Sequence, residues 1–264
     1  MMEPDKLIER ARYDARAQSQ LKQGAPVADV PLGSQTMPAY LRAPYLFYEQ
    51  KISQLLTPQH HVLELGAGGG MHTRALVQTG AHVTASDISR SSLDLLAQRF
   101  SGLDGNLRTE VADMEDLPFE THSFDFVVSA GSLSYGEPSV VDAQIRRVLR
   151  PGGTLICVDS LNHNPVYRLN RWVHYLRGDR SKSTLKRMPD LVRIDSLSKG
   201  FSVAEANYFG AFSFAMPVLA RLSGENTAQA ISDRLDRAIG VRRLAFKFVL
   251  VARGCPCDGN ILLS

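Results

Sequence analysis

The amino-acid sequence predicts an α/β fold in which helices flank a doubly wound, mostly parallel β-sheet. Short apolar runs alternate with stretches of helical periodicity, and strands separated by helices pair in parallel through crossover connections. The first run ends in a glycine-rich turn that a helix follows, which is the order of elements at a ligand-binding corner of such sheets. The apolar runs lie at residues 61–65, 82–86, 107–112, 124–130 and 154–159.

The glycine-rich turn spans residues 66–70 and separates a short buried strand from a predicted helix at 71–78. Glycine permits the sharp turn, and the lack of a Cβ lets a ligand lie against the backbone. Unpaired N–H groups at the start of the helix then face that ligand. The turn therefore predicts a site for a nucleoside or a phosphate.

Carboxylates end the next two apolar runs. Asp87 follows Gly66 by 21 residues and ends the second run, and Asp113 ends the third. A carboxylate at the end of the second strand can accept hydrogen bonds from both hydroxyls of a ribose. The other interpretation of Asp87 is a helix cap, because a helical pattern begins at residue 90, although Ser89 could cap that helix as well.

Further elements precede and follow this core. The helix predicted at 3–22 carries Leu7, Ile8 and Ala11 on one face, and a loop rich in Pro and Gly separates it from a helix at 39–56. A helix at 139–150 should stop at Pro151-Gly152-Gly153. The elements predicted after the fifth run are a strand at 201–212, helices at 213–239 broken near Ser223-Gly224, and a last strand at 246–253.

The stretch at 45–160, with its glycine-rich turn and the two carboxylates, resembles a class I S-adenosylmethionine-dependent methyltransferase, and the resemblance returns at the last strand. It implies a Rossmann-like fold whose last strand inserts antiparallel beside the fifth. It also implies an enzyme that uses S-adenosyl-L-methionine as its cofactor. Residues 164–178 are similar, more weakly, to methyltransferases of bacterial surface-polysaccharide pathways.

The resemblance assigns parts of the cofactor to particular residues. Asp113 would accept from the adenine amino group, and Ile88 and Met114 would enclose the adenine ring, although Met114 fits ordinary core packing equally well. Glu64 would help to hold the ammonium group or orient the loop. The expected cofactor-binding residues are Glu64, Gly66, Ala67, Gly68, Asp87, Ile88, Asp113, Met114, Ser129 and Ala130.

Three tyrosines, Tyr40, Tyr45 and Tyr48, lie in the helical pattern before the first strand. In class I methyltransferases a helix at this place often covers the cofactor, and these rings could do so. Aromatic residues at helical spacing more often belong to the core, so packing against the sheet edge is the favoured interpretation.

Two other classes share parts of the pattern. A nicotinamide-dependent dehydrogenase would carry G-x-G-x-x-G, but Met71 stands where the third glycine should be, and that glycine permits close helix–strand packing. A cofactor-binding scaffold without catalysis would keep the same glycines and carboxylates. The pattern G-x-x-x-x-G-K-[ST] of P-loop nucleotidases does not occur in the sequence.

Methyl transfer is an in-line displacement, so alignment and exclusion of water supply most of the catalysis. A hydroxyl acceptor also needs a base, whereas a carbon or amine acceptor can react without one. Reacting groups lie at the carboxyl ends of the strands in this fold, which selects Tyr135, Asp159 and His163 as catalytic candidates. His163 is the first candidate for the base and His174 a weaker one, the alternative for His163 being a loop histidine that caps the next helix with Asn164.

A basic segment follows the fifth run. Residues 165–199 contain nine Lys or Arg and three Asp, a local charge of +6. We expect residues 161–200 to form a cap in which Arg168 and Arg171 bind an anionic acceptor, such as a nucleotide-sugar or a phosphate-bearing glycan, for O-methylation. The alternatives are a solvated helix face for the charges and a quinone or natural-product scaffold as the acceptor.

The bulk composition sets outer limits. A net charge of +3 does not favour a nucleic-acid partner, and three cysteines are too few for a disulfide framework. Cys255 and Cys257 would need two more ligands to hold a metal, so no metal is expected. The sequence lacks a signal-peptide core and an apolar run long enough for a transmembrane helix, so the cytoplasm is the expected location.

The predicted domain organisation has four parts. A region at 1–58 would cover the cofactor site, and residues 59–160 with 201–253 would form the cofactor-binding domain. The substrate cap would be 161–200 and the tail 254–264.

Overall fold

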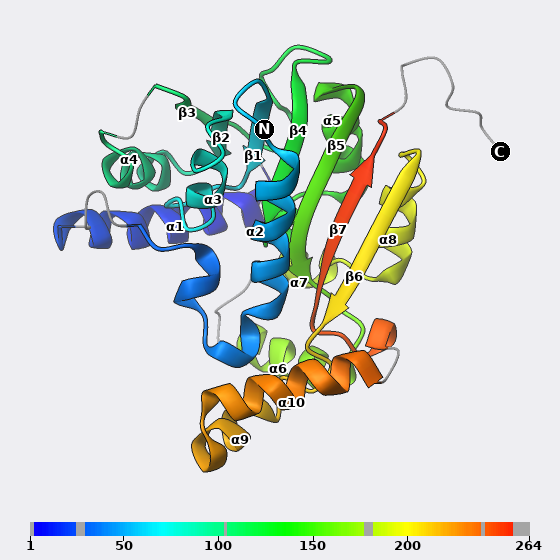
Figure 1. The fold of residues 1–264 in the computed structure, drawn as a ribbon. Coiled ribbons are helices and arrows are strands. Elements are labelled where there is room, and N and C mark those ends of the chain that lie inside the picture. The colour runs from blue at the N-terminus through cyan, green and yellow to red at the C-terminus, as the bar shows by residue number, and fades with distance from the viewer. Residues whose placement is uncertain (1–2, 25–29, 103–104, 177–181, 239–240, 256–264) are drawn as a thin grey trace.

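The computed structural model describes residues 3–24, 30–102, 105–176, 182–238 and 241–255. Its centre is a seven-stranded sheet of order β3-β2-β1-β4-β5-β7-β6, in which β7 alone runs antiparallel to its neighbours (Figure 1). This arrangement confirms the predicted Rossmann-like fold and the antiparallel last strand. The strands are β1 His61–Leu65, β2 His82–Asp87, β3 Leu107–Val111, β4 Phe124–Ala130, β5 Leu149–Ser160, β6 Val203–Phe209 and β7 Lys247–Arg253.

Helices cover both faces of the sheet because alternate side chains of the strands point to opposite faces. In β1, Leu63 and Leu65 pack toward α5 (Pro138–Val148) and α8 (Leu191–Ser198), whereas Val62 packs toward α2 (Ala43–Leu55) and α3 (Thr73–Val77). All three side chains are fully buried. Each such burial stabilises the fold by roughly 1.5–3 kcal/mol.

The fifth strand starts earlier than the sequence indicated. The predicted helix ends at Val148 rather than near residue 150, and Leu149 already pairs with Phe124 of β4. The Pro151-Gly152-Gly153 stretch lies within β5, next to a shift in the register of that pairing. Glycine is required at 153, because a Cβ there would lie 2.8 Å from the carbonyl oxygen of Arg150.

The segment after β5 forms three helices, α6 (Pro165–Leu176), α7 (Lys182–Lys186) and α8. Ile194 and Leu197 of α8 are buried against the sheet, so the last part of the predicted cap belongs to a helical layer of the sheet. The next two helices, α9 (Met216–Ser223) and α10 (Glu225–Ala238), are separated at Gly224, as the sequence predicts. Gly224 has a φ of 85°, a backbone conformation that glycine adopts without strain.

Two N-terminal helices have different roles. The tyrosines Tyr45 and Tyr48 of α2 are buried in the core, so the expected core role of these two rings is confirmed, but they pack on inner strands rather than at the edge of the sheet. The first helix, α1 (Pro4–Lys22), packs instead against α4 (Arg90–Arg99). In Figure 1 it lies at the left, below β1, β2 and β3 and beside α4.

Short 3-10 helices complete the described chain: η1 Gly33–Thr36, η2 Ala39–Leu41, η3 Leu133–Tyr135 and η4 Val241–Arg243. Cys157 is a buried residue of β5, and Cys257 lies outside the described residues. Within the described ranges, no helix combines the length and apolar character needed to cross a bilayer. The same residues contain no group of three His, Cys, Asp or Glu side chains arranged to hold a metal ion.

Candidate functional site

A cavity of about 390 Å³ lies where β1, β2 and β4 end, with α1 forming one of its walls. Parallel strands place their carboxyl ends, and the loops that follow them, on the same edge of the sheet. This geometry brings together residues that are distant in the sequence. Nine of the predicted site residues line the cavity: Gly66, Ala67, Gly68, Asp87, Ile88, Asp113, Met114, Ala130 and Tyr135.

The glycine-rich turn forms the floor of this cavity. Gly66 and Gly68 have φ angles of 65° and 53°, in the left-handed region that favours glycine. A Cβ on Gly66 would lie 2.4 Å from the Cβ of Ser132, so the fold itself requires glycine there. A Cβ on Gly68 would meet no atom within 4 Å. The open side of the turn at Gly68 is therefore the side that a ligand can approach.

Asp87 joins this turn to the end of β2. Its Oδ2 accepts from the backbone N–H of Gly68 at 2.9 Å, and its Oδ1 accepts from that of Ser89 at 2.8 Å. Burial raises the pKa of Asp87, whereas these backbone hydrogen bonds act to lower it. The cap of α4 is Ser89, whose side chain accepts from the N–H of Ser92. Asp87 thus faces the cavity as a fixed acceptor, and the helix does not depend on it for its cap.

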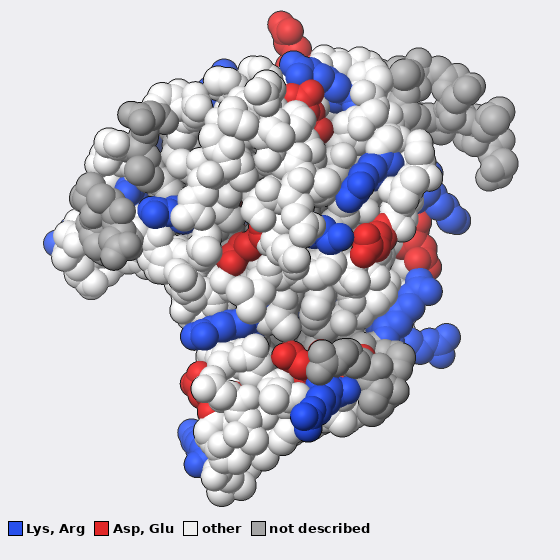
Figure 2. All heavy atoms as spheres, in the orientation of Figure 1, with Lys and Arg blue, Asp and Glu red and all other residues white. Residues whose placement is uncertain are grey.

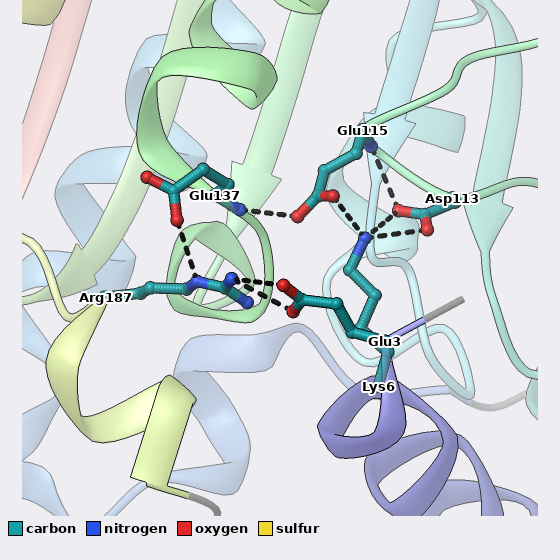
Figure 3. A network of polar contacts seen from close by, with 6 residues as sticks. All are labelled: Glu3, Lys6, Asp113, Glu115, Glu137 and Arg187. Atoms are coloured by element: carbon teal, nitrogen blue, oxygen red, sulfur yellow. Dashed lines mark hydrogen bonds and ion pairs between the residues drawn. The ribbon is translucent and has the colours of Figure 1, made fainter. Parts of the chain in front are cut away.

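Asp113 lines the cavity and is paired with a lysine of α1. Lys6 Nζ donates to Oδ1 and Oδ2 of Asp113 at 2.9 and 2.7 Å, and lies 2.7 Å from an oxygen of Glu115. Figure 3 shows Lys6 pointing from α1 toward these two carboxylates. Helix α1 is therefore fastened to the turn that follows β3.

The part of the chain that forms most of this site resembles known proteins. Residues 62–153 match a family model described as "Methyltransferase domain". This part of the chain is therefore similar to methyltransferase domains.

Curated relatives match a stretch of similar length. Demethylmenaquinone methyltransferase of Clavibacter sepedonicus is 39% identical over 109 residues, which are 40% of this chain and 44% of that protein. Malonyl-[acyl-carrier protein] O-methyltransferase of Alcanivorax borkumensis is 38% identical over 109 residues, 40% of this chain and 37% of that protein. The chain thus spans less than half the length of these curated relatives.

Solved structures show the same fold over nearly the whole chain. Geranyl diphosphate C-methyltransferase from Streptomyces coelicolor A3(2) has a TM-score of 0.62 and 14% identity, with 96% of this chain and 98% of that chain covered. A sarcosine dimethylglycine methyltransferase from Galdieria sulphuraria has a TM-score of 0.58 and 19% identity, with 92% and 98% covered. The helices outside residues 62–153 therefore also have counterparts in these two structures.

Two predicted cofactor residues of the methyltransferase domain lie behind the cavity wall. Glu64 is buried and accepts from Thr73 Oγ1 at 2.7 Å. Burial raises the pKa of Glu64 to about 7. Ser129 Oγ lies 2.7 Å from Ser132 Oγ, and Ser132 in turn donates to the carbonyl oxygen of Leu65 at 2.8 Å. Of these side chains, only Ser132 lines the cavity, so Glu64 and Ser129 are placed to support the loops that do.

The raised pKa of Glu64 makes stability depend on pH. Between pH 4.5 and about 7 the folded chain keeps a proton that the unfolded chain has lost, so the free energy of unfolding falls as pH rises. Glu64→Gln should therefore stabilise the chain by about 1–3 kcal/mol at about pH 8 and much less at about pH 5. Urea denaturation of both proteins at the two pH values measures this difference. A stability difference independent of pH would contradict the assignment.

The three catalytic candidates occupy different places. Tyr135 lines the cavity, and its hydroxyl lies 2.7 Å from that of Tyr13 on α1. Asp159 is buried and accepts from the backbone N–H groups of Leu133 and Ser160 at 3.0 and 2.6 Å, which fixes η3 to the end of β5. His163 is exposed and does not line the cavity. The structure thus brings Tyr135 to the methyltransferase site and leaves the other two outside it.

The predicted acceptor-binding arginines also lie outside the cavity. Arg171 is only 5% exposed, and its guanidinium donates to the carbonyl oxygen of Leu161 at 2.9 Å and to the side chain of Asn162 at 3.3 Å. Arg168 is exposed. The side chain of His174 lies outside the described residues. Arg171 therefore stabilises the segment after β5, a role that the sequence pattern did not indicate.

The sequence analysis placed the region 1–58 over the cofactor site but named no residue of α1 as part of its lining. Leu7 and Ile8, which belong to the apolar face noted in the sequence, are 42% and 61% exposed. The residues of α1 that line the cavity are spaced three or four apart, which is the spacing of one helix face. Because most of them are polar, this face was not recognised in the sequence as one that packs inward. These residues are Lys6, Glu9, Tyr13, Ala17 and Gln20.

His72 is a second residue that was missed. It follows the glycine-rich turn, lines the cavity and stacks on Tyr45 with 5.2 Å between ring centroids. Burial, together with the charge of Lys247, lowers the pKa of His72 to about 4. Its imidazole is therefore neutral at neutral pH, and a neutral imidazole can accept a hydrogen bond.

Proposed function

We propose that this chain transfers the methyl group of S-adenosylmethionine to a small-molecule acceptor. The observation that carries the proposal is the cavity at the carboxyl ends of the strands, where the turn at Gly68, Asp87 and Asp113 meet within a methyltransferase domain. Its volume of about 390 Å³ suits a small ligand. The donor site would lie in 59–160 with 201–253, beneath the N-terminal region, and the acceptor would approach from the side of 161–200.

The residues present fit this cofactor. Asp87 offers a buried carboxylate to a ribose diol, and Asp113 offers one to the adenine amino group. Ile88 and Met114 supply apolar walls for the adenine ring, and Ala130, at the end of β4, lies where the methionine portion is expected. Structures similar in fold to this chain include complexes with S-adenosylhomocysteine and with sinefungin.

The chain's own groups would bind the cofactor and the acceptor, orient them, and exclude water. The cofactor, when bound, supplies an electrophilic methyl carbon on a sulfonium. Helix α1 covers one side of the cavity and limits the access of water, which favours a reaction in which charge is lost. For a hydroxyl acceptor, His72 and Glu9 are cavity groups that could receive the proton. A carbon or amine acceptor needs neither group.

Several of the basic residues expected to bind an anionic acceptor instead make contacts within the protein. Arg171 is buried, Arg193 pairs with Asp142 at 3.0 Å, and Arg187 pairs with glutamates. On the face drawn in Figure 2, the Lys and Arg side chains are scattered among acidic ones rather than gathered over one element. These observations favour an uncharged acceptor, such as a quinone or a natural-product scaffold, over the nucleotide-sugar or phosphate-bearing glycan.

Isothermal titration with S-adenosylhomocysteine and NADH, followed by a labelled-methyl assay, tests the function. We expect binding of S-adenosylhomocysteine alone and methyl transfer to a demethylated quinone or a related scaffold. Binding of NADH instead would support an oxidoreductase, and binding without turnover on quinones, nucleotide-sugars or lipid-linked glycans would support a non-catalytic scaffold.

A further inference from the structure

The contact between Lys6 and the turn after β3 is largely withdrawn from water. The side chain of Lys6 is 7% exposed, and those of Asp113 and Glu115 are 21% and 20% exposed. An ion pair in such surroundings is screened less than one on the open surface. Since both Lys6 and Asp113 line the cavity, the ion pair forms part of the wall of the proposed cofactor site.

This contact belongs to a closed ring of polar interactions, shown in Figure 3. Glu115 Oε1 accepts from the backbone N–H of Glu137 at 2.6 Å, and Glu137 Oε2 accepts from Arg187 Nε at 3.2 Å. Arg187 Nη2 then donates to Glu3 of α1 at 3.1 Å, which closes the ring. The ring fastens α1 to the turn after β3, to the start of α5 and to the residue that follows α7.

The carboxylate of Asp113 retains room for a further donor. Each carboxylate oxygen can accept two hydrogen bonds. Among the described residues, Oδ1 accepts from Lys6 and from the N–H of Glu115 at 3.0 Å, whereas Oδ2 accepts from Lys6 alone. Lys6 thus fixes the orientation of the carboxylate, and one acceptor position stays available on the residue that faces the cavity.

We propose that Lys6 positions Asp113 as the acceptor for the adenine amino group and that the same contact latches α1 over the bound cofactor. This inference rests on the proposed function. Helix α1 presents Glu9, Tyr13 and Ala17 to the cavity, so its displacement opens that wall. A ligand that pairs with Asp113 is therefore released faster when the Lys6 contact is broken.

The test compares Lys6→Met with Lys22→Met, a change of an exposed lysine in the last turn of the same helix. Dissociation of S-adenosylhomocysteine is followed by stopped flow, and its affinity is compared with that of the inosine analogue, which lacks the amino group. We expect Lys6→Met to accelerate release by about tenfold and to reduce discrimination between the two ligands by a similar factor, since the carboxylate that pairs with the amino group is then no longer held in place. Lys22→Met should behave like the unchanged chain. Lys6→Arg should keep most of the slow release and most of the discrimination between the two ligands.

A measurement on the unchanged chain tests the proposal even if the Lys6→Met variant does not fold. Its release rate should rise as the salt concentration increases, because salt weakens the ion pairs of Lys6. A salt-independent release rate, or a Lys6→Met protein with the kinetics and discrimination of Lys22→Met, would overturn the latch but leave the proposed function standing. Failure of the unchanged chain to bind S-adenosylhomocysteine would overturn both.

Discussion

Replacing Gly68 by valine is expected to abolish binding of the methyl donor while the sheet remains folded. The φ of Gly68 is 53°, and an added Cβ would meet no protein atom within 4 Å, so the new side chain would project into the cavity. The left-handed backbone costs a residue with a Cβ about 1–2 kcal/mol, a loss that a folded domain can tolerate. We expect the affinity for S-adenosylhomocysteine to fall by more than about 100-fold, which is more than 2.7 kcal/mol.

Gly152→Val is the matched control for this change. Gly152 has a φ of 81° and also has no atom within 4 Å of an added Cβ, but it lies near the start of β5, away from the cavity. Both variants therefore carry similar backbone strain, and only one fills the site. Calorimetric titration and urea denaturation of both separate binding from stability. Equal affinities in the two proteins would show that the glycine-rich turn has no direct part in binding.

Asp87→Asn is expected to have the next largest effect. The substitution keeps the size of the side chain but replaces an ionised acceptor with a neutral amide. Asp87 uses one oxygen for Gly68 and the other for Ser89, and an amide has only one oxygen to serve them and the ribose. We expect the affinity for S-adenosylhomocysteine to fall by about 1.5–3 kcal/mol, or roughly 10- to 150-fold.

Asp125→Asn provides the comparison for Asp87→Asn. Asp125 also accepts from a backbone N–H, that of His61 at 2.8 Å, and pairs with Arg150 at 2.6 Å. It lies near the amino ends of β1 and β4, at the opposite edge of the sheet from the cavity. This variant should lose stability without losing affinity. Unchanged affinity in a folded Asp87→Asn protein would contradict the assignment of the ribose acceptor.

The parts of the structure predicted correctly depend on short-range patterns. Apolar runs of five to seven residues marked strands such as β1, β4 and β5, and the break at Gly224 was visible as a glycine between two helical patterns. Asp87 and Asp113 could be located because a carboxylate at the end of a strand is a local feature. The sequence placed these residues at the site since the topology of the sheet brings the strand ends together.

The incorrect or missing parts depend on long-range contacts. The inward face of α1 is polar, and Lys6 becomes a buried residue only through a partner 107 positions away. The burial of Arg171 was also not predictable. Its guanidinium donates to a carbonyl and to an amide oxygen, and a pattern of charges in the sequence does not reveal such acceptors. The early start of β5 follows from pairing of Leu149 with Phe124, which outweighs the helical pattern of the preceding residues.

The ring at α1 also has a consequence for how the chain folds as it is made. Helix α1 is synthesised before the strands of the sheet, but Asp113 follows Lys6 by 107 residues and Arg187 follows Glu3 by 184. Closing such long loops is entropically costly, and α1 contributes no strand to the sheet, so the sheet can assemble before α1 docks. By the same reasoning α1 should open at a lower free energy than the sheet in the folded protein, and its amides should exchange with solvent before those of β1 and β4.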